Sequence, residues 1–282
     1  MTVVRGGAAH ELTAPVEDYL KAIYEIESTG GAGGPTAVGA AGIGAEGDRD
    51  RESREGGAAG TNEIAQALRI APASVTGMLR RLAEQGLITY ERYSGVRLTE
   101  GGRRAAMRTI RRHRVIEAYL TSALGYPWDR VHQEAERLEH AASDELIDRM
   151  ATAIGEPATD PHGAPIPSRD GTVNTRPLLA LAEVPVGASV RILQVGDRDP
   201  EQLRYLAELG ITPGVDVQVA ARAPFGGPIT LRFEGSAERE RRKHGGAEPA
   251  RECAVGPSLA EQIFVAPFRR SSHQERRSSR RG

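Results

Sequence analysis

The sequence has few of the features that mark secreted or membrane proteins. Its 282 residues include a single cysteine, Cys253, which excludes an internal disulfide framework and fits a reducing compartment. No run approaches the roughly 18 apolar residues of a membrane span, and the N-terminal stretch MTVVRGGAAHELTAP lacks the apolar core of a signal peptide. We therefore expect a cytoplasmic protein without membrane contact, long enough for two or three domains.

Lysine is also scarce, and the charges are unevenly distributed. Lys21 and Lys243 are the only lysines, so 37 − 2 = 35 of the basic residues are arginine. Between residues 61 and 114, 11 Arg stand against 4 Glu, an excess of 11 − 4 = +7. Between residues 115 and 160, 3 Arg stand against 10 Asp and Glu, or 3 − 10 = −7. The basic block favours a polyanionic partner, and the acidic block favours cations.

The N-terminal half has the pattern of a winged helix-turn-helix. Apolar residues at helical spacing around Pro15 predict a first helix, and the Gly-rich, Ala-rich and charged residues 29–60 predict a disordered insertion. Thr61 is expected to cap the next helix, and a third helix is expected at about 72–85. Two short strands around a turn at 93–95 complete the pattern.

The remainder of the chain divides into a helical part and a β-rich part. Further helices are expected at 100–124 and from Trp128 to about 137, and onward to 154. Several Pro and Gly residues then indicate a linker. From Leu178 onward, short β-like runs and one short helix predict a small SH3-like barrel, with a polar insertion at 236–257 before its last strand.

Potential metal ligands recur at helical spacing between residues 113 and 140. One His and one Glu separated by a single turn would by themselves suggest a solvated acidic face, but two such elements in succession favour a metal site. Imidazole and carboxylate ligands without cysteine suit a divalent ion such as Mn2+, Fe2+, Co2+, Ni2+ or Zn2+. These residues are His113, Glu117, His132, Glu136, Glu139 and His140.

The ordered succession of motifs resembles the DtxR/MntR family of metal-dependent transcriptional repressors. It is carried by VEDYLKAIYEIE, TNEIAQALRIAPASVTGMLRRLAEQGLI, YERYSGVRLTEGG, HRVIEAYL, VHQEAERLEHAASDEL and DPHGAPIP. The stretch ELGITPGVDVQVAARAPFGGPITLRF is similar to the FeoA-type SH3-like domain found in many members. The implied fold is mainly α with small β. Its parts are a winged helix-turn-helix DNA-binding domain at 11–112, a metal-binding and dimerisation domain at 113–155, a linker at 156–177, an SH3-like domain at 178–268 and a basic disordered tail at 269–282.

The resemblance implies two metal sites. The primary site would use Asp18, Glu136, Glu139 and His140. The ancillary site would use His113, Glu117 and His132, completed by Asp197 and Asp199 from the SH3-like domain. Iron-responsive relatives typically have Met and Cys where Asp18 and Glu136 stand, so the carboxylates favour Mn2+, the harder ion.

Two further residues bear on the metal sites. Two-domain manganese regulators tend to carry an acidic residue where Lys21 stands, which argues against a close binuclear manganese cluster in this chain. His162, within DPHGAPIP, is interpreted as a linker histidine rather than a ligand.

The recognition helix is expected to insert its N-terminal end into the major groove of DNA. Its side chains there are small, so specificity would depend on DNA shape and on contacts with thymine methyl groups. Arg80, Arg81 and the wing residue Tyr93 are candidate phosphate ligands. The residues at the N-terminal end are Ala71, Pro72, Ala73, Ser74, Thr76 and Gly77.

We therefore predict a homodimeric, manganese-dependent repressor of metal-ion uptake or homeostasis that binds a pseudo-palindromic operator in double-stranded DNA. Fe2+ is the alternative metal, and Co2+, Ni2+ or Zn2+ are expected to substitute in vitro. No small-molecule substrate is expected. A metallohydrolase is disfavoured because the sequence has no H-E-x-x-H motif, and an SH3-like adaptor is the third alternative.

Overall fold

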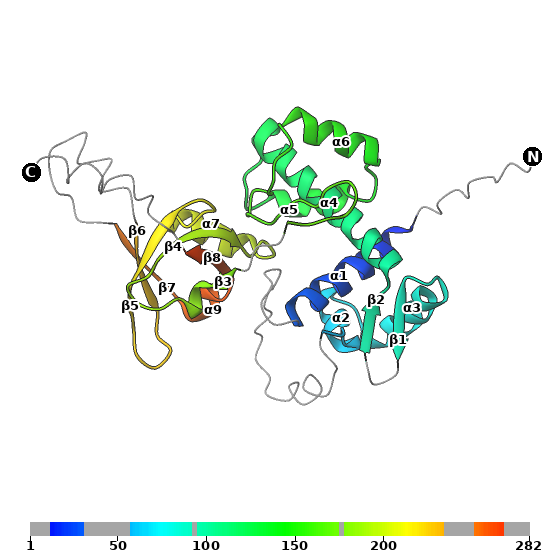
Figure 1. The fold of residues 1–282 in the computed structure, drawn as a ribbon, viewed down its shortest axis with the longest axis horizontal. Helices are drawn as coiled ribbons and strands as arrows, with labels where there is room; N and C mark the ends of the chain where they lie inside the picture. The colour runs from blue at the N-terminus through cyan, green and yellow to red at the C-terminus, as the bar shows by residue number, and fades with distance from the viewer. Residues whose placement is uncertain (1–11, 31–56, 92–94, 175–177, 234–250, 268–282) are drawn as a thin grey trace, which may run out of the picture. The chain divides into compact units, whose positions relative to one another are not determined.

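The computed structural model describes residues 12–30, 57–91, 95–174, 178–233 and 251–267, and these residues form two units (Figure 1). The first unit contains 12–160 and 165–174, and the second contains 161–164 and 178–267, each with the gaps just given. No described helix is long and apolar enough to cross a membrane.

The first unit consists of six helices and one hairpin within its described residues. They are α1 (Ala14–Gly30), α2 (Thr61–Ala67), α3 (Pro72–Glu84), β1 (Ile88–Glu91), β2 (Gly95–Leu98), α4 (Glu100–Leu124), α5 (Val131–Leu138) and α6 (Asp144–Ala153).

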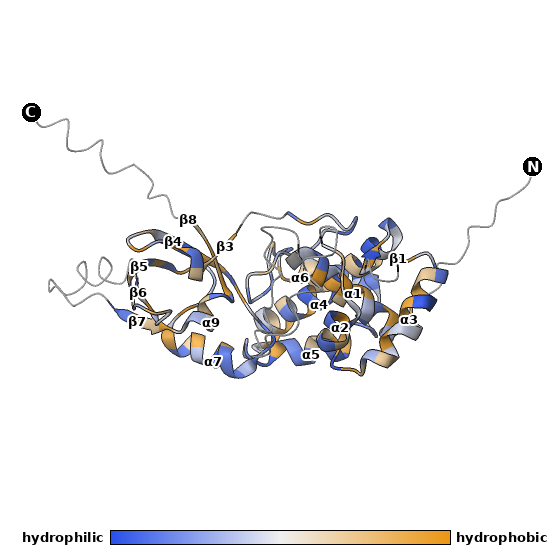
Figure 2. Cartoon of the chain, turned by 90° about the horizontal axis from the view of Figure 1, so that it is seen from below, coloured by the Kyte–Doolittle hydropathy of each residue, from blue (hydrophilic) through white to orange (hydrophobic). Residues whose placement is uncertain are grey.

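The predicted winged helix-turn-helix is present. Its core gathers buried residues from α1, α2, α3, the hairpin and the start of α4, among them Leu20, Ile64, Leu79 and Val96. These side chains recur at helical or alternating spacing, which places polar residues outside, and Figure 2 shows hydrophobic and hydrophilic residues mixed along α1 and α3. Pro72 occupies the first turn of α3, where its missing N–H leaves no helical hydrogen bond unmade.

Both ends of the segment predicted as a disordered insertion, 29–60, are ordered. Helix α1 extends to Gly30, and residues 31–56 lie outside the described residues. Ala59 is buried and forms an isolated antiparallel bridge with Val96 of the wing. The prediction that Thr61 caps α2 is wrong. Gly60 is the N-cap, and its backbone N–H donates to Glu63 Oε2 at 2.7 Å.

The second half of the first unit is built on α4. Thr99 Oγ1 accepts a hydrogen bond from Gly102 N at 3.1 Å and caps the helix, which ends at Gly125 in the left-handed conformation. The distal half of α4 packs against α5 and α6 through a second buried core that includes Ile116 and Ile147. Helix α5 starts at Val131 rather than at Trp128, and it ends at Leu138.

The predicted linker at 156–177 is folded over much of its described part. Arg111 Nη1 donates to the carbonyl of Pro167 at 2.8 Å, and Arg114 Nη1 donates to that of Pro165 at 2.6 Å. Ile166 N donates to the carbonyl of Ala158 at 2.9 Å. These bonds fasten the segment to α4, because proline carbonyls remain free to accept hydrogen bonds.

The second unit is an antiparallel sheet of six strands in the order β3-β8-β4-β5-β6-β7, with short helices. Apolar residues from alternate strand positions and from α7 fill its interior, as the SH3-like prediction requires. The elements are β3 (Leu179–Ala180), the 3-10 helix η2 (Leu181–Glu183), β4 (Ser189–Val195), α7 (Pro200–Leu209), β5 (Asp216–Arg222), β6 (Ile229–Phe233), β7 (Glu252–Val255), α9 (Pro257–Ala260) and β8 (Ile263–Pro267).

Two predictions about this unit need correction. The insertion predicted at 236–257 includes strand β7, which pairs with β6, whereas residues 236–250 lie outside the described residues.

His162 is fully buried, and its carbonyl accepts a hydrogen bond from Val195 N at 2.9 Å. The adjacent Gly163 has a φ of +92°, and a Cβ at this position would lie 1.9 Å from the carbonyl oxygen of Leu193. Only glycine fits such a close approach of two backbones.

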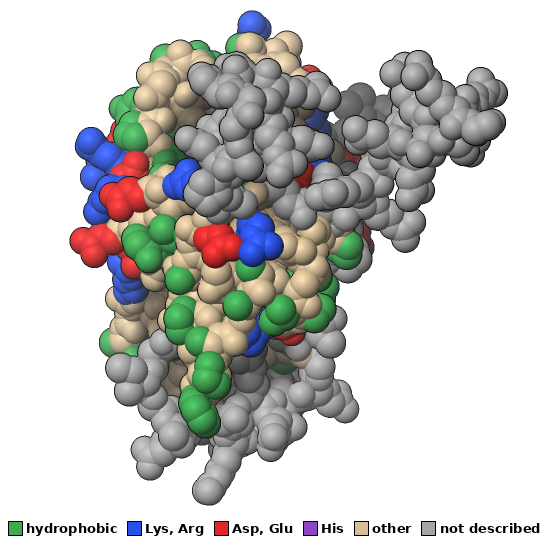
Figure 3. Space-filling view, turned by 90° about the vertical axis from the view of Figure 1, so that its left-hand side faces the viewer, with side chains coloured by type: hydrophobic (Ala, Val, Ile, Leu, Met, Phe, Trp, Pro, Cys, Tyr) green, Lys and Arg blue, Asp and Glu red, His purple; other side chains and the backbone are tan. Residues whose placement is uncertain are grey.

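The surface of the second unit pairs its charges. Figure 3 shows Lys or Arg side chains beside Asp or Glu on the face that it presents. Arg191 Nε lies 2.6 Å from Asp216 Oδ1, and Arg232 Nη2 lies 2.8 Å from Glu252 Oε1. Exposed pairs such as these contribute little to stability.

Candidate metal centre and nucleic-acid interface

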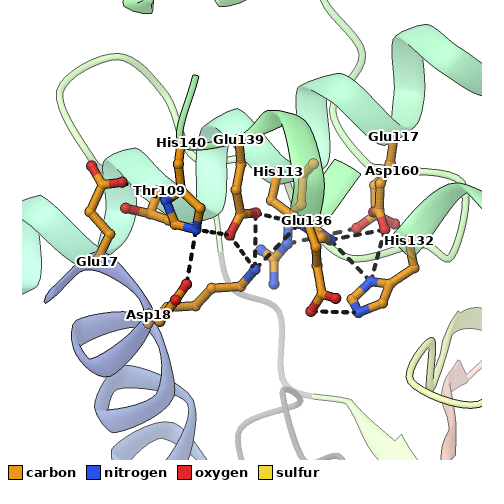
Figure 4. Close-up of polar contacts among 12 residues, drawn as sticks. Glu17, Asp18, Thr109, His113, Glu117, His132, Glu136, Glu139, His140 and Asp160 are labelled. Carbon is orange, nitrogen blue, oxygen red and sulfur yellow. Dashed lines mark hydrogen bonds and ion pairs between the residues drawn. The ribbon is translucent and has the colours of Figure 1, made fainter. Parts of the chain in front are cut away.

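Three helices of the first unit bring the predicted ligands together (Figure 4). Asp18 lies in the first turns of α1, His113 and Glu117 lie one turn apart on α4, and the others lie on or just after α5. Glu139 is the C-cap of α5, and His140 follows it, so these two ligands lie beyond the regular helix on which they were predicted.

Asp18, Glu139 and His140 form one group. His140 Nε2 lies 3.0 Å from Asp18 Oδ1 and 3.5 Å from Glu139 Oε1. Each residue offers a ligand atom within 4.8 Å of the other two. Burial raises the pKa of Asp18, because the carboxylate loses hydration. The group thus joins α1 to the end of α5.

His113, Glu117 and His132 form a second group. Glu117 Oε1 lies 3.0 Å from His113 Nε2 and 3.1 Å from His132 Nδ1, and the two ring nitrogens lie 3.0 Å apart. Burial and Lys21 disfavour the charged imidazole, but Glu117 and Glu139 outweigh them and raise the pKa of His113. In this group too, one candidate ligand atom from each residue lies within 4.8 Å of those of the other two residues.

The two groups are in direct contact through Glu139. Its Oε2 lies 2.5 Å from His113 Nδ1, and both of its carboxylate oxygens accept from Lys21 Nζ at 3.1 Å. Burial alone would raise the pKa of Glu139, but these hydrogen bonds lower it. The sequence resemblance implies Glu139 as a ligand of the primary site alone, whereas in the structure it also contacts His113 of the ancillary group.

Glu136 is the one predicted primary ligand that lies apart from Asp18. Its Oε1 is 3.4 Å from His132 Nε2, and the side chain is 56% exposed. A hydrogen bond with His132 lowers the pKa of Glu136 to about 2. The structure therefore shows Glu136 beside the ancillary group, and its membership of the primary site stays a prediction.

Asp197 and Asp199 belong to the second unit. Asp199 is the N-cap of α7, and its Oδ1 accepts from Glu201 N at 2.9 Å. Asp197 is partly buried and precedes this helix. Their role as ancillary ligands stays a prediction.

Glu17 was not among the predicted site residues. Its Oε2 lies 2.7 Å from His140 Nδ1, and its Oε1 accepts from Arg112 Nη1 at 3.0 Å. A hydrogen bond at one ring nitrogen fixes the tautomer and orientation of the imidazole and leaves the other nitrogen available for a metal. The signal in the sequence was its position, adjacent to Asp18 on a helix that faces the ligands.

The donor set fits a divalent transition metal. Both groups supply carboxylate oxygen and imidazole nitrogen, without sulfur, from side chains that converge within bonding range of one small ion. Glu117 and Glu139 are almost fully buried. Buried carboxylates need compensating positive charge, which Lys21 supplies in part for Glu139 and which a bound cation would add.

The predicted recognition helix exposes its N-terminal end. Val75, Leu79 and Leu82 face the core, which leaves the opposite face of α3 to solvent. Thr76 is half-buried, Tyr93 lies outside the described residues, and the other predicted DNA contacts are exposed: Ala71, Pro72, Ala73, Ser74, Gly77, Arg80 and Arg81.

Part of the basic block is paired within the protein. Arg103 binds Glu27 at 2.7 Å, Arg111 binds Asp148 at 2.9 Å, and Arg112 lies 3.0 Å from a Glu17 oxygen. The excess of +7 counted along the sequence is therefore not all available to a polyanion. Arg80 and Arg81 remain exposed on α3.

Comparison with known proteins agrees with this architecture. Family models match the iron dependent repressor N-terminal DNA binding domain at residues 51–96, the iron dependent repressor metal binding and dimerisation domain at 99–168 and the FeoA domain at 179–267.

Individual relatives include both iron and manganese regulators. The iron-dependent repressor IdeR of Mycobacterium tuberculosis is 28% identical over 238 residues, which are 80% of this chain and 91% of that protein. The regulator MntR of Lysinibacillus sphaericus is 36% identical over 98 residues, 35% of this chain and 70% of that protein. A solved manganese-dependent transcriptional repressor in complex with manganese has a TM-score of 0.70 and 33% identity, and the match covers 90% of this chain and all of that one.

These matches confirm the resemblance of the sequence motifs, the winged helix-turn-helix and the FeoA-type domain. They do not fix the metal, because iron and manganese regulators both appear. The chain belongs to the DtxR/MntR family of metal-dependent transcriptional repressors, which bind operator DNA as dimers.

Proposed function

We propose that the chain is a manganese-dependent repressor of metal-ion uptake or homeostasis. The observation that carries this proposal is the position of Asp18 beside Glu139 and His140, where typical iron regulators have a sulfur ligand. Oxygen ligands favour Mn2+ because the later divalent metals gain most from soft ligands. The likeness to a repressor solved with manganese supports the same choice.

Asp18, Glu139 and His140 would hold the ion, with Glu136 as a fourth ligand. Glu136 contacts His132 in the structure, so its role as a ligand would require its side chain to leave that partner. When bound, the ion would supply two positive charges that balance the carboxylates of α1 and α5. Glu17 keeps the ring of His140 oriented through its hydrogen bond to Nδ1.

Helix α1 is well placed to transmit the metal state to the DNA-binding elements. Asp18 lies near its N-terminus, and Glu27 lies more than two turns later. Glu27 Oε1 accepts from Leu98 N of the wing at 2.7 Å, and Glu27 Oε2 accepts from Arg103 at 2.7 Å. Because one helix carries both contacts, a metal-fixed α1 would also fix the wing. DNA would then favour the metal-bound geometry, and linkage requires DNA to tighten metal binding in return.

The second group, His113, Glu117 and His132, would hold an ancillary ion, completed by Asp197 and Asp199. Fe2+ remains the second candidate metal, because IdeR matches a larger share of this chain than MntR does. Co2+, Ni2+ and Zn2+ would substitute in vitro, since they accept the same ligands.

On DNA, the N-terminal end of α3 and its N-cap would enter the major groove through Ala71, Pro72, Ala73, Ser74, Thr76 and Gly77. Arg80, Arg81 and Tyr93 would bind phosphates. The operator would be pseudo-palindromic to match a two-fold dimer. We infer that the protein acts in the cytoplasm and performs no catalysis.

A mobility-shift assay with chelator-treated protein tests this function. Asp18→Ala and Glu136→Ala are expected to abolish the stimulation of operator binding by Mn2+. Glu134→Ala is the matched control, because Glu134 lies on α5 but pairs with Arg137 at 3.3 Å. Unchanged metal dependence in both ligand variants would exclude the assigned primary site. Calorimetric titration with Mn2+ and with Fe2+, followed by DNA binding at equal occupancy, decides between the two metals.

A further inference from the structure

Lys21 places a lysine ammonium between the two groups of candidate ligands. It follows Asp18 by three residues on α1, and its side chain is 15% exposed. Nζ lies 3.1 Å from each carboxylate oxygen of Glu139 and 3.3 Å from His113 Nδ1. An ammonium so placed carries one positive charge directly beside the candidate ligands.

Glu139 is the residue that this charge affects most. The side chain is 2% exposed, and Lys21 supplies a full positive charge against it. The same carboxylate also offers an oxygen to the group with Asp18 and His140. A divalent ion bound to Glu139 would therefore lie close to the ammonium, and two like charges at short range in a poorly hydrated site repel each other.

We propose that Lys21 is a built-in cation that competes with the divalent ion for Glu139 and so raises the metal concentration at which the protein responds. This inference rests on the proposed metal centre. It assigns Lys21 a role in setting metal affinity, although Lys21 is not itself a ligand.

The alternative role for Lys21 is to hold Glu139 in position for the metal. The geometry argues against it, because Glu139 has other restraints. His113 Nδ1 lies 2.5 Å from its Oε2, and the backbone N–H of Glu139 donates to the carbonyl of Ala135 at 2.9 Å. Removal of Lys21 leaves both restraints in place, so the dominant effect is the loss of a competing charge.

If Lys21 competes with the metal, its removal lowers the Kd for Mn2+, and if Lys21 positions Glu139, its removal raises that Kd. Titration calorimetry can separate the two roles. In full-length, chelator-treated protein, Lys21→Met is expected to lower the Kd for Mn2+ by at least about tenfold, since a unit charge at this range is worth more than one decade. Lys21→Gln also removes the charge but keeps a hydrogen-bond donor for Glu139. The Lys21→Gln protein keeps the test possible if the Lys21→Met protein does not fold. Arg137→Met is the matched control, because it removes an exposed positive charge from nearby α5.

The second readout is the melting temperature, measured first without metal and then with Mn2+. Because Glu139 loses its cation, the melting temperature of the metal-free Lys21→Met protein is expected to fall below that of the wild type. The rise in melting temperature on addition of Mn2+ is expected to be larger in the variant. The Arg137→Met control is expected to change neither quantity measurably.

The outcomes separate this inference from the proposed function. If folded Lys21→Met and Lys21→Gln proteins bind Mn2+ as weakly as the wild type, or more weakly, competition by Lys21 is refuted and a positioning role replaces it. If the wild type itself fails to bind Mn2+, the proposed function falls instead.

Discussion

Glu27 is expected to hold the wing to α1, and Glu27→Ala tests this directly. The substitution removes the acceptor of the Leu98 N–H and of the Arg103 guanidinium, both at 2.7 Å. A buried N–H left without a partner costs about 1–3 kcal/mol. The Arg103 pair adds at most about 1 kcal/mol, because this arginine is half exposed. We expect a loss of about 1–4 kcal/mol in the free energy of unfolding.

The assay is chemical denaturation of metal-free protein followed by far-ultraviolet circular dichroism. Glu27→Gln keeps an acceptor oxygen and is expected to lose less than about 1 kcal/mol. Glu100→Ala is the matched control. It removes another Glu–Arg pair of the same domain, but one in which both side chains are mostly exposed. Its cost is expected to stay below about 1 kcal/mol.

Glu27→Ala also tests the coupling between metal binding and DNA binding. Glu27 is nine residues beyond Asp18, so Mn2+ affinity is expected to change less than about twofold in Glu27→Ala. Operator affinity in the presence of Mn2+ is expected to fall at least about tenfold, which corresponds to about 1.4 kcal/mol of lost coupling. If the Glu27→Ala protein unfolds like the wild type, and if Mn2+ stimulates its DNA binding as in the wild type, Glu27 does not hold the wing to α1.

Three further predictions concern orientation, packing and pH. Glu17→Gln is expected to weaken Mn2+ binding about 10–100-fold in calorimetry, because His140 loses the carboxylate that orients it, and an unchanged Kd would contradict this role. Gly163→Ala is expected to destabilise the second unit by about 2–5 kcal/mol, measured by thermal unfolding, because its Cβ would overlap the carbonyl of Leu193. Burial raises the pKa of Glu27 above its ordinary 4.5, so the folded state gains an increment of stability when this carboxyl is protonated and loses that increment as pH rises through the folded pKa. The stability of the wild type relative to Glu27→Gln is therefore expected to fall as pH rises above 4.5 in denaturation at several pH values, and a pH-independent difference would count against this reasoning.

The helices could be predicted because their apolar residues recur at the period of an α-helix. Helix α4 matches the predicted 100–124 without change, and α3 differs by one residue at its end. The segments that prediction missed are short. Ala58 and Ala59 are small residues that pack against the wing, and their burial depends on a distant strand. Strand β7 has four residues after a long polar run, so local sequence carries little signal for it.

The candidate metal centre also has features that the sequence predicts and features that it does not. Spacing along the chain identified His113, Glu117 and His132, because each ligand on a helix faces the next one a turn away. The i, i+4 spacing also places Glu136 beside His132, but it could not show whether the carboxylate turns toward Asp18 instead, because that depends on side-chain torsions. It also could not show that Lys21 reaches Glu139 across two helices. Contacts between elements that are far apart in the sequence become visible only in the folded structure.

The segregation of charge along the sequence has a structural consequence that the charge counts alone do not reveal. Arginines of the basic block lie on α4, and carboxylates of the acidic block lie on α6 and the segment after it. Arg111 lies 2.9 Å from Asp148, and Arg112 lies 2.9 Å from Asp144, both on α6. Arg114 lies 3.7 Å from Asp160. The two blocks therefore partly neutralise each other within the first unit, which favours packing of α6 and the following segment on α4. At the metal centre, the carboxylate of Glu139 lies 3.1 Å from the Lys21 ammonium, which is the positive charge that a bound metal ion would have to compete with.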